Sequence, residues 1–229
     1  MERHFHKQLQ DLKETLFKMA SLVEMAIAKS IESLVNRDDK LADEVMHSDN
    51  NINNLEILVD EQCLKLLALQ QPMALDLRFL TSAMKINNDL ERMGDHAVNI
   101  AERAKCLNEE EPLKPLIDLP RMAQIVQSMV KDSLDSFVNG DMEKARAVCK
   151  TDDQVDKLDD QIFRVLLTYM IGDTQTIPRS LDLILVSKNL ERIADLATNI
   201  AEEVIFIYKA KTIKHHIESK EFKDVRPRS

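Results

Sequence analysis

The chain has few of the residues that interrupt helices or build sheets. Its 229 residues include only 3 Gly and 6 Pro, whereas sheet proteins need turns at short intervals that use both residues. Aromatic residues make up 4% of the chain, and tryptophan is absent. Leu, Ile, Met, Ala, Glu and Lys dominate instead, which is typical of long helices. The composition therefore predicts an all-α protein.

Three further deficits limit the class of function. Lys and Arg number 31 against 40 Asp and Glu, and the net charge of −9 is opposite to that of a nucleic-acid binder. No apolar run approaches the roughly 20 residues that span a bilayer, and the N-terminus lacks the apolar core of a secretory signal. The three cysteines, Cys63, Cys106 and Cys149, are scattered and form no CxxC pair, as in a reducing compartment. We expect a cytoplasmic protein with no nucleic-acid partner and no direct membrane insertion.

One phrase occurs twice in the chain. Residues 87–104 read NNDLERMGDHAVNIAERA, residues 187–204 read SKNLERIADLATNIAEEV, and the two align without gaps at a shift of 100. A second pair, SLVNRD at 33–38 and SFVNGD at 136–141, aligns at a shift of 103. Repeats of this length indicate a duplicated unit, so each half should have the same architecture.

The apolar residues of each half follow a helical period and predict three helices per half. Pro112, Pro115 and Pro120 cannot all lie inside one helix, so we expect the linker at residues 108–120. The predicted fold is two tandem, repeated, antiparallel three-helix bundles. The expected helices end near residues 36, 71, 107, 139, 172 and 215; the expected parts are 1–110, the first repeat, 118–216, the second repeat, and 217–229, a polar tail.

Each copy of the phrase contains Glu-x-x-x-Asp, and residues four apart lie on one face of a helix. Like charges at this spacing destabilise a helix by roughly 0.2–0.5 kcal/mol, so their recurrence favours a compensating cation. Carboxylate oxygens suit hard cations such as Mg²⁺, Mn²⁺ or Ca²⁺, and also iron. An asparagine continues each stripe. The candidate ligands are Glu91, Asp95 and Asn99 in the first half and Glu191, Asp195 and Asn199 in the second.

An ordinary solvated face is the alternative interpretation of these stripes. In it, the arginine that follows each glutamate pairs with the aspartate three residues later, and spacing alone leaves both interpretations open. The preceding helix of each half also carries an acidic stripe, which adds Asp49 and Asp152 as candidates if it faces the motif. A charged outer face would explain this second stripe equally well.

Two residues inside the first motif have informative counterparts. Gly94 costs a helix about 1 kcal/mol relative to alanine, and its counterpart Ala194 is also small, so a close helix crossing is expected there. His96 corresponds to Leu196, so a site common to both halves cannot need histidine. We therefore expect protein ligands that bind through oxygen only.

The sequence resembles the PhoU family in two matching segments, QPMALDLRFLTSAMKINNDLERMGDHAVNIAE (71–102) and LDLILVSKNLERIADLATNIAE (181–202). The resemblance covers nearly the whole chain. It implies a cytoplasmic accessory protein of the phosphate-specific transport system that represses the phosphate-starvation response. Such a protein couples the ATPase of the phosphate ABC transporter to a sensor histidine kinase. The resemblance also implies a homodimer, and multinuclear iron or zinc clusters on the two Glu/Asp-x-x-x-Asp motifs.

The second motif departs from the family's usual Gly-Asp-His, because it reads Ala194-Asp195-Leu196. We therefore expect the weaker metal site in the second half. No Gly-rich phosphate loop, HExxH or nucleophile elbow occurs in the sequence. The resemblance to the PhoU family implies a non-enzymatic regulator, and we expect no catalytic residues. The alternatives are a carboxylate-bridged metalloenzyme and a purely structural helical adaptor.

Overall fold

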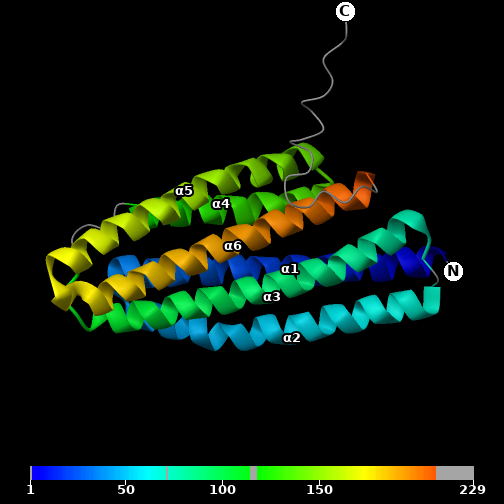
Figure 1. Ribbon diagram of the computed structural model, residues 1–229. Helices are drawn as coiled ribbons and strands as arrows, with labels where there is room; N and C mark the ends of the chain where they lie inside the picture. Colours follow the sequence, from blue (N-terminus) through cyan, green and yellow to red (C-terminus); the bar gives the residue numbers. More distant parts are fainter. Residues whose placement is uncertain (1, 71, 114–117, 210–229) are drawn as a thin grey trace, which may run out of the picture.

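The computed structural model describes residues 2–70, 72–113 and 118–209, and in these ranges the chain forms six α-helices, one short 3-10 helix and no strand. The predicted all-α class is confirmed (Figure 1). The end expected near residue 215 and the polar tail at 217–229 lie outside the described residues. The elements are α1 (Glu2–Asn36), α2 (Asp39–Gln70), α3 (Ala74–Asn108), α4 (Asp118–Asn139), α5 (Met142–Gly172), η1 (Thr174–Thr176) and α6 (Ile177–Lys209).

Each half is an antiparallel three-helix bundle, and the halves pack side by side through α3 and α6, the pair of helices with the most extensive contact (Figure 1). Arg78 Nε donates to the carbonyl of Ile207 at 3.0 Å, and toward the other end of α3 Arg103 pairs with Asp182 at 3.3 Å. The residue later in α3 thus contacts the residue earlier in α6, so these two helices are antiparallel. The two copies of the repeated phrase therefore cross near the middle of the molecule.

The α1–α2 and α4–α5 turns show the duplication at atomic detail. Arg37 and Gly140 occupy equivalent positions with φ of 56° and 68°. The next residues, Asp38 and Asp141, each donate a backbone N–H to a serine carbonyl five residues earlier at 2.9 Å. Their side chains then accept from the first N–H groups of the following helix, which is a standard helix cap. The matched SLVNRD and SFVNGD phrases thus encode one turn twice.

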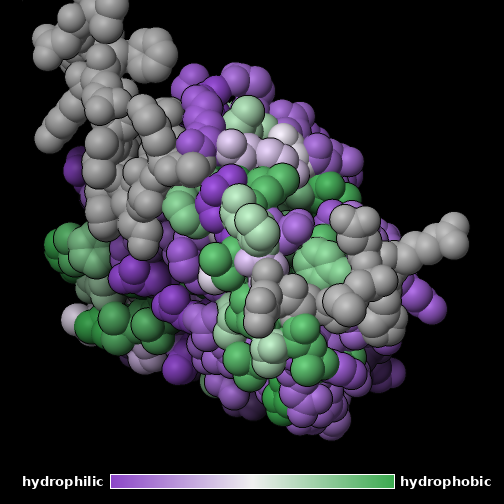
Figure 2. Space-filling view, turned by 90° about the vertical axis from the view of Figure 1, so that its right-hand side faces the viewer, coloured by the Kyte–Doolittle hydropathy of each residue, from purple (hydrophilic) through white to green (hydrophobic). Residues whose placement is uncertain are grey.

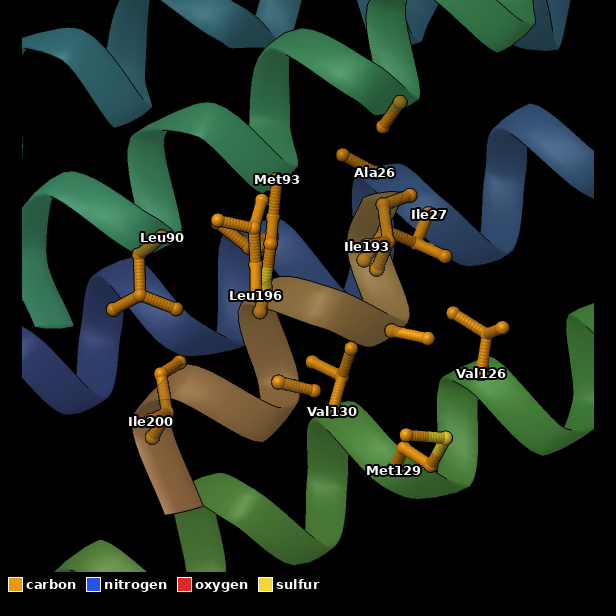
Figure 3. Close-up of a cluster of buried hydrophobic side chains, with 14 of the residues drawn as sticks. Ala26, Ile27, Leu90, Met93, Val126, Met129, Val130, Ile193, Leu196 and Ile200 are labelled. Carbon is orange, nitrogen blue, oxygen red and sulfur yellow. The ribbon is translucent and has the colours of Figure 1, made fainter. Parts of the chain in front are cut away.

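One continuous apolar core joins the two halves. Ile27 of α1, Met93 of α3, Met129 of α4 and Ile193 of α6 meet in it, all at most 2% exposed (Figure 3). Leu196, also 2% exposed, lies in the same cluster, so the second half uses for packing the position that holds His96 in the first. Each such side chain stabilises the fold by roughly 1.5–3 kcal/mol. No helix formed by the described residues is both long and apolar enough to cross a membrane.

The linker is shorter than the predicted 108–120, because α4 already begins at Asp118. Pro120 therefore lies in the first turn of α4, where a helix does not need the missing N–H. α6 begins at Ile177, so Pro178 also lies in the first turn of a helix.

Glu203 of α6 joins the two halves through a buried polar contact. It is 8% exposed and accepts hydrogen bonds from Ser82 Oγ and Lys85 Nζ of α3, both at 2.7 Å. The repeat shift of 100 relates Glu203 to Arg103 and Ser82 to Asp182. The equivalent contact in the other half is thus the more exposed Arg103–Asp182 pair. The acid again lies on α6, but at the repeat position that corresponds to Ser82 and not at the one that corresponds to Glu203.

We predict that Glu203→Ala lowers the free energy of unfolding by about 1–3 kcal/mol, because it leaves the buried Ser82 hydroxyl without its acceptor. Asp182→Ala is the matched control; it breaks the equivalent but more exposed pair and should cost less than about 1 kcal/mol. Urea denaturation followed by circular dichroism measures both. Equal losses in the two variants would contradict this view of the interface.

Candidate metal centre

The first motif faces α2 across a close helix crossing. A Cβ placed on Gly94 would lie 3.0 Å from Ile52 Cδ1 and 3.6 Å from Asp49 Oδ1. Glycine therefore lets α2 approach the turn of α3 that carries Glu91 and Asp95, as the sequence suggested. Asp49 is brought to the motif by this crossing.

Four carboxylates on α2 and α3 act on one another at this crossing. Burial raises the pKa of Glu91 above its usual value, and the charges of Asp95, Glu56 and Asp49 raise it further. Burial and then Asp49 raise the pKa of Asp95, while His96 lowers it. Burial also raises the pKa of Glu56, with Asp95 among the carboxylates that add to the shift. We call Asp49, Glu56, Glu91 and Asp95 the α2–α3 acidic cluster.

The α2–α3 acidic cluster also contains buried oxygens without a protein donor. Asn53 Nδ2 donates to Asp49 Oδ2 at 2.8 Å, but Asp49 Oδ1 and Asn53 Oδ1 are buried and accept no hydrogen bond in the described part of the chain. A buried unsatisfied acceptor costs about 1–3 kcal/mol. Among the described residues Arg92 forms no ion pair with Asp95, so the intrahelical pairing of the alternative interpretation does not occur in this half.

The second motif is partly compensated by its own helix. Arg192 Nη1 donates to Asp195 at 3.1 Å, and its Nε lies 3.6 Å from Glu191 Oε2. Burial and then Asp195 raise the pKa of Glu191, while Arg192 and Lys188 lower it. The solvated-face interpretation therefore describes the second half better than the first.

The remaining candidates lie at different places around the two motifs. Burial raises the pKa of Asp156 of α5, and the aspartate of the second motif raises it further, so Asp156 faces that motif directly. Asp152 is half-buried one turn earlier on α5. Asn99 is exposed, and Asn199 hydrogen-bonds to Asp89 of α3, so its side chain is directed to α3. The metal-binding roles of Asp152, Asn99 and Asn199 stay predictions.

The sequence analysis did not select Glu56 as a ligand, although it lies seven residues after Asp49 on the same face of α2. In the described ranges no three His, Cys, Asp or Glu side chains are grouped closely enough to hold a metal ion. The donor chemistry of the α2–α3 acidic cluster nevertheless fits a hard cation, because it combines repelling carboxylates with unpartnered buried oxygens. The metal site stays a prediction that these residues support.

The comparisons with known proteins agree with the duplicated architecture. The family model of the PhoU domain matches residues 16–104 and again 119–204. A phosphate-specific transport system accessory protein PhoU homolog from Aquifex aeolicus is 45% identical over 93% of this chain and 97% of the relative. A Caulobacter vibrioides protein of the same description is 40% identical over 89% of both chains.

Two crystal structures have the same fold. PhoU from Pseudomonas aeruginosa superposes with a TM-score of 0.89 at 38% identity, over 90% of this chain and all of the other. The phosphate transport system regulatory protein PhoU from Streptococcus pneumoniae gives a TM-score of 0.86 at 28% identity, over 92% of this chain and all of the other. The chain therefore belongs to the PhoU family.

We predict that Glu91→Gln/Asp95→Asn stabilises the chelator-treated protein at pH 7 by about 0.5 kcal/mol, a value reduced for solvent screening. The folded-state pKa values of both acids are raised, so their ionisation disfavours the folded state. The cost is fully present above the folded-state pKa values and disappears as the pH falls below the unfolded values. The gain should therefore shrink on acidification and vanish at about pH 3, below the ordinary pKa values of both acids.

Urea titrations of the chelator-treated protein at both pH values measure this gain. The equivalent variant Glu191→Gln/Asp195→Asn is the control, and its gain should be smaller because Arg192 already pairs with Asp195. A loss of stability in the first variant at pH 7 would show that the cluster is not repulsive.

Proposed function

We propose that this protein regulates phosphate uptake and phosphate-starvation signalling, without catalysing a reaction. The observation that supports this most is the similarity of both repeats to the PhoU domain, together with relatives described as phosphate-specific transport system accessory proteins. The similarity to the Aquifex relative extends over nearly the full length of both chains, so the whole functional unit of that relative has a counterpart here.

In this proposal the protein acts in the cytoplasm as a homodimer that couples the ATPase of a phosphate ABC transporter to a sensor histidine kinase. Repression of the starvation response requires contact with both partners. The two similar faces of the duplicated fold suit such a role, because repeated helical surfaces can bind different proteins once their side chains diverge.

The metal site belongs to the same proposal. Glu91, Asp95 and Asp49 would hold one or more cations, with iron or zinc as the expected metals, and Asn53 would orient Asp49. A bound cation would supply positive charge that neutralises the repelling carboxylates. Gly94 allows the ligands from α2 and α3 to come together. The second site, at Glu191 and Asp195, would be weaker because Arg192 competes with the cation.

Deletion of the gene in its native host should raise the expression of phosphate-starvation genes in phosphate-rich medium. The reason is that the repressing link between transporter and kinase would be lost. A reporter fused to a starvation-induced promoter measures the effect, and re-expression of the wild-type chain is the control. Unchanged expression would contradict the regulatory function.

The Glu91→Gln/Asp95→Asn double variant should lose about half of the bound metal or more, because each substitution removes a charged oxygen ligand and keeps the side-chain size. Elemental analysis of the purified protein measures the metal, and circular dichroism should show unchanged helix content. Asp11→Asn/Glu14→Gln, which changes two exposed acids of α1, is the matched control.

Metal at the wild-type level in the motif variant would contradict the first-half site. Wild-type protein without metal would favour the structural adaptor. Turnover of a phosphoester by the metal-loaded protein would favour the metalloenzyme.

A further inference from the structure

The hairpin of α5 and α6 carries two rows of exposed apolar side chains, one on each helix. Within each row the residues are spaced by four, so they lie on one face of their helix. Their side chains are 37–78% exposed. We call these six residues the α5–α6 apolar face: Phe163, Leu167 and Ile171 of α5, and Ile177, Leu181 and Leu185 of α6.

The two rows run beside each other along antiparallel neighbouring helices (Figure 1). Lys188 Nζ and Ser187 Oγ of α6 both donate to the carboxylate of Asp159 on α5, at 2.5 and 2.8 Å. Phe163 follows Asp159 by one turn, and Leu185 precedes Lys188 by about one turn. Both rows therefore begin next to this contact and continue together to η1, so the six side chains form one continuous surface.

The equivalent hairpin of the first half does not carry this face. The repeat shifts, 103 between α2 and α5 and 100 between α3 and α6, give the six counterparts as Asp60, Leu64, Ala68, Leu77, Thr81 and Lys85. Only the two leucines among them are large apolar residues. Figure 2 views the end of the molecule that holds the α2–α3 connection, where hydrophobic side chains are interspersed with hydrophilic ones. Since the same positions of the same fold accept an acid, a hydroxyl and a base, folding does not require the α5–α6 apolar face.

The extent of the α5–α6 apolar face suits a contact between two proteins. Six partly exposed side chains of this size present on the order of 500 Å² of apolar surface, which is as much as the largest patch of a typical monomer and is often functional. A specific interface buries at least about 1,000 Å² in total. Two copies of this face would reach that area if they covered each other.

The charges that border the face favour a second copy of the chain over a charged partner. Arg164 pairs with Asp160 at 2.7 Å, and Arg103 pairs with Asp182 at 3.3 Å. The Lys188–Asp159 pair borders the end nearest the second motif. A partner that is recognised by its charge needs unpaired charges of one sign, and these three pairs offer none. Two copies of net charge −9 would here oppose apolar side chains and compensated pairs, which limits their repulsion.

We propose that the α5–α6 apolar face binds the same face of a second copy of the chain across a two-fold axis. In such a contact one patch supplies both sides of the interface, so the two α5–α6 hairpins pack against each other. This inference rests on the homodimer of the function proposed above and names its surface. The α2–α3 acidic cluster lies in the other half of each chain and takes no part in the contact.

The first half of the chain supplies the substitutions for the test. Phe163→Asp/Leu181→Thr/Leu185→Lys gives the α5–α6 hairpin the residues that the equivalent positions carry in the α2–α3 hairpin. The wild type should sediment as a dimer. The triple variant should raise the dissociation constant of the dimer about a hundredfold or more, because three apolar side chains of each copy lose their contact. Sedimentation equilibrium of the full-length chain measures both constants.

Met25→Ser/Ile57→Asp/Leu58→Gln is the matched control. It makes the reverse exchange, because each position receives the residue of its counterpart in the second half. These three side chains are exposed to a similar degree, 41–58%, but lie outside the α5–α6 apolar face. The control should form dimers as the wild type does. Circular dichroism of both variants checks that the helices are retained.

Amide hydrogen exchange of the wild type gives a second measurement that needs no substitution. As the protein concentration is raised through the dissociation constant, exchange should slow in residues 160–171 and 177–185. Exchange in the equivalent residues 57–68 and 77–85 should not change, because the first-half hairpin stays outside the contact. Slowing in the first-half hairpin alone would contradict the proposed surface.

Two results of the sedimentation experiment would overturn the proposal. One is a monomeric wild-type protein, which would leave the face to a different partner. The other is a triple variant that dimerises as tightly as the control. The reporter of starvation-induced expression separates these failures from a failure of the regulatory function. A wild-type chain that is monomeric and still restores repression would show that the interface is wrong while the regulatory function holds.

Discussion

The antiparallel packing of α3 against α6 is the interaction on which the rest of the structure depends. Both helices carry the duplicated phrase, and both use its apolar residues, such as Leu90 and Leu190, for the shared core. Once these faces are buried, Glu91 and Asp95 must face α2, and Glu191 and Asp195 must face α5. The acidic motifs are therefore kept apart by the same contact that joins the two halves.

Duplication gave two equivalent environments, and single side chains have since made them different. Arg192 pairs with Asp195, whereas the corresponding arginine of the first half leaves Asp95 unpaired among the described residues. Leu196 extends the core where the first half has His96, which instead bonds to Asn189 of α6 at 2.9 Å. The result is a first half whose Asp95 has no arginine partner among the described residues and a second half whose Asp195 is paired with Arg192.

Much of the fold could be predicted from the sequence because apolar periodicity and turn residues are local signals. The helix ends at Asn36 and Gly172 and the close crossing at Gly94 follow from neighbouring residues. The linker boundary was wrong because a proline also fits the first turn of a helix. The direction of α3 relative to α6 is a long-range property that no local pattern specifies.

The candidate site shows the same division between local and long-range information. Spacing placed Glu91 and Asp95 on one face of α3, and the acidic stripe of α2 was expected to add ligands if it faced that motif. Which acid of α2 or α5 meets the motif depends on helix rotation, so Glu56 and Asp156 were not selected as ligands. Two arginines at identical places in the repeat differ in pairing, and the sequence alone cannot distinguish them.

The central proposal is that the α2–α3 acidic cluster binds a cation. Anomalous X-ray diffraction from crystals of the wild-type protein grown with iron or zinc tests it most directly. We predict a peak beside Glu91, Asp95 and Asp49 that is stronger than any peak beside Glu191 and Asp195. An anomalous map with no peak at the first cluster, or with a peak at the second cluster alone, would contradict the account.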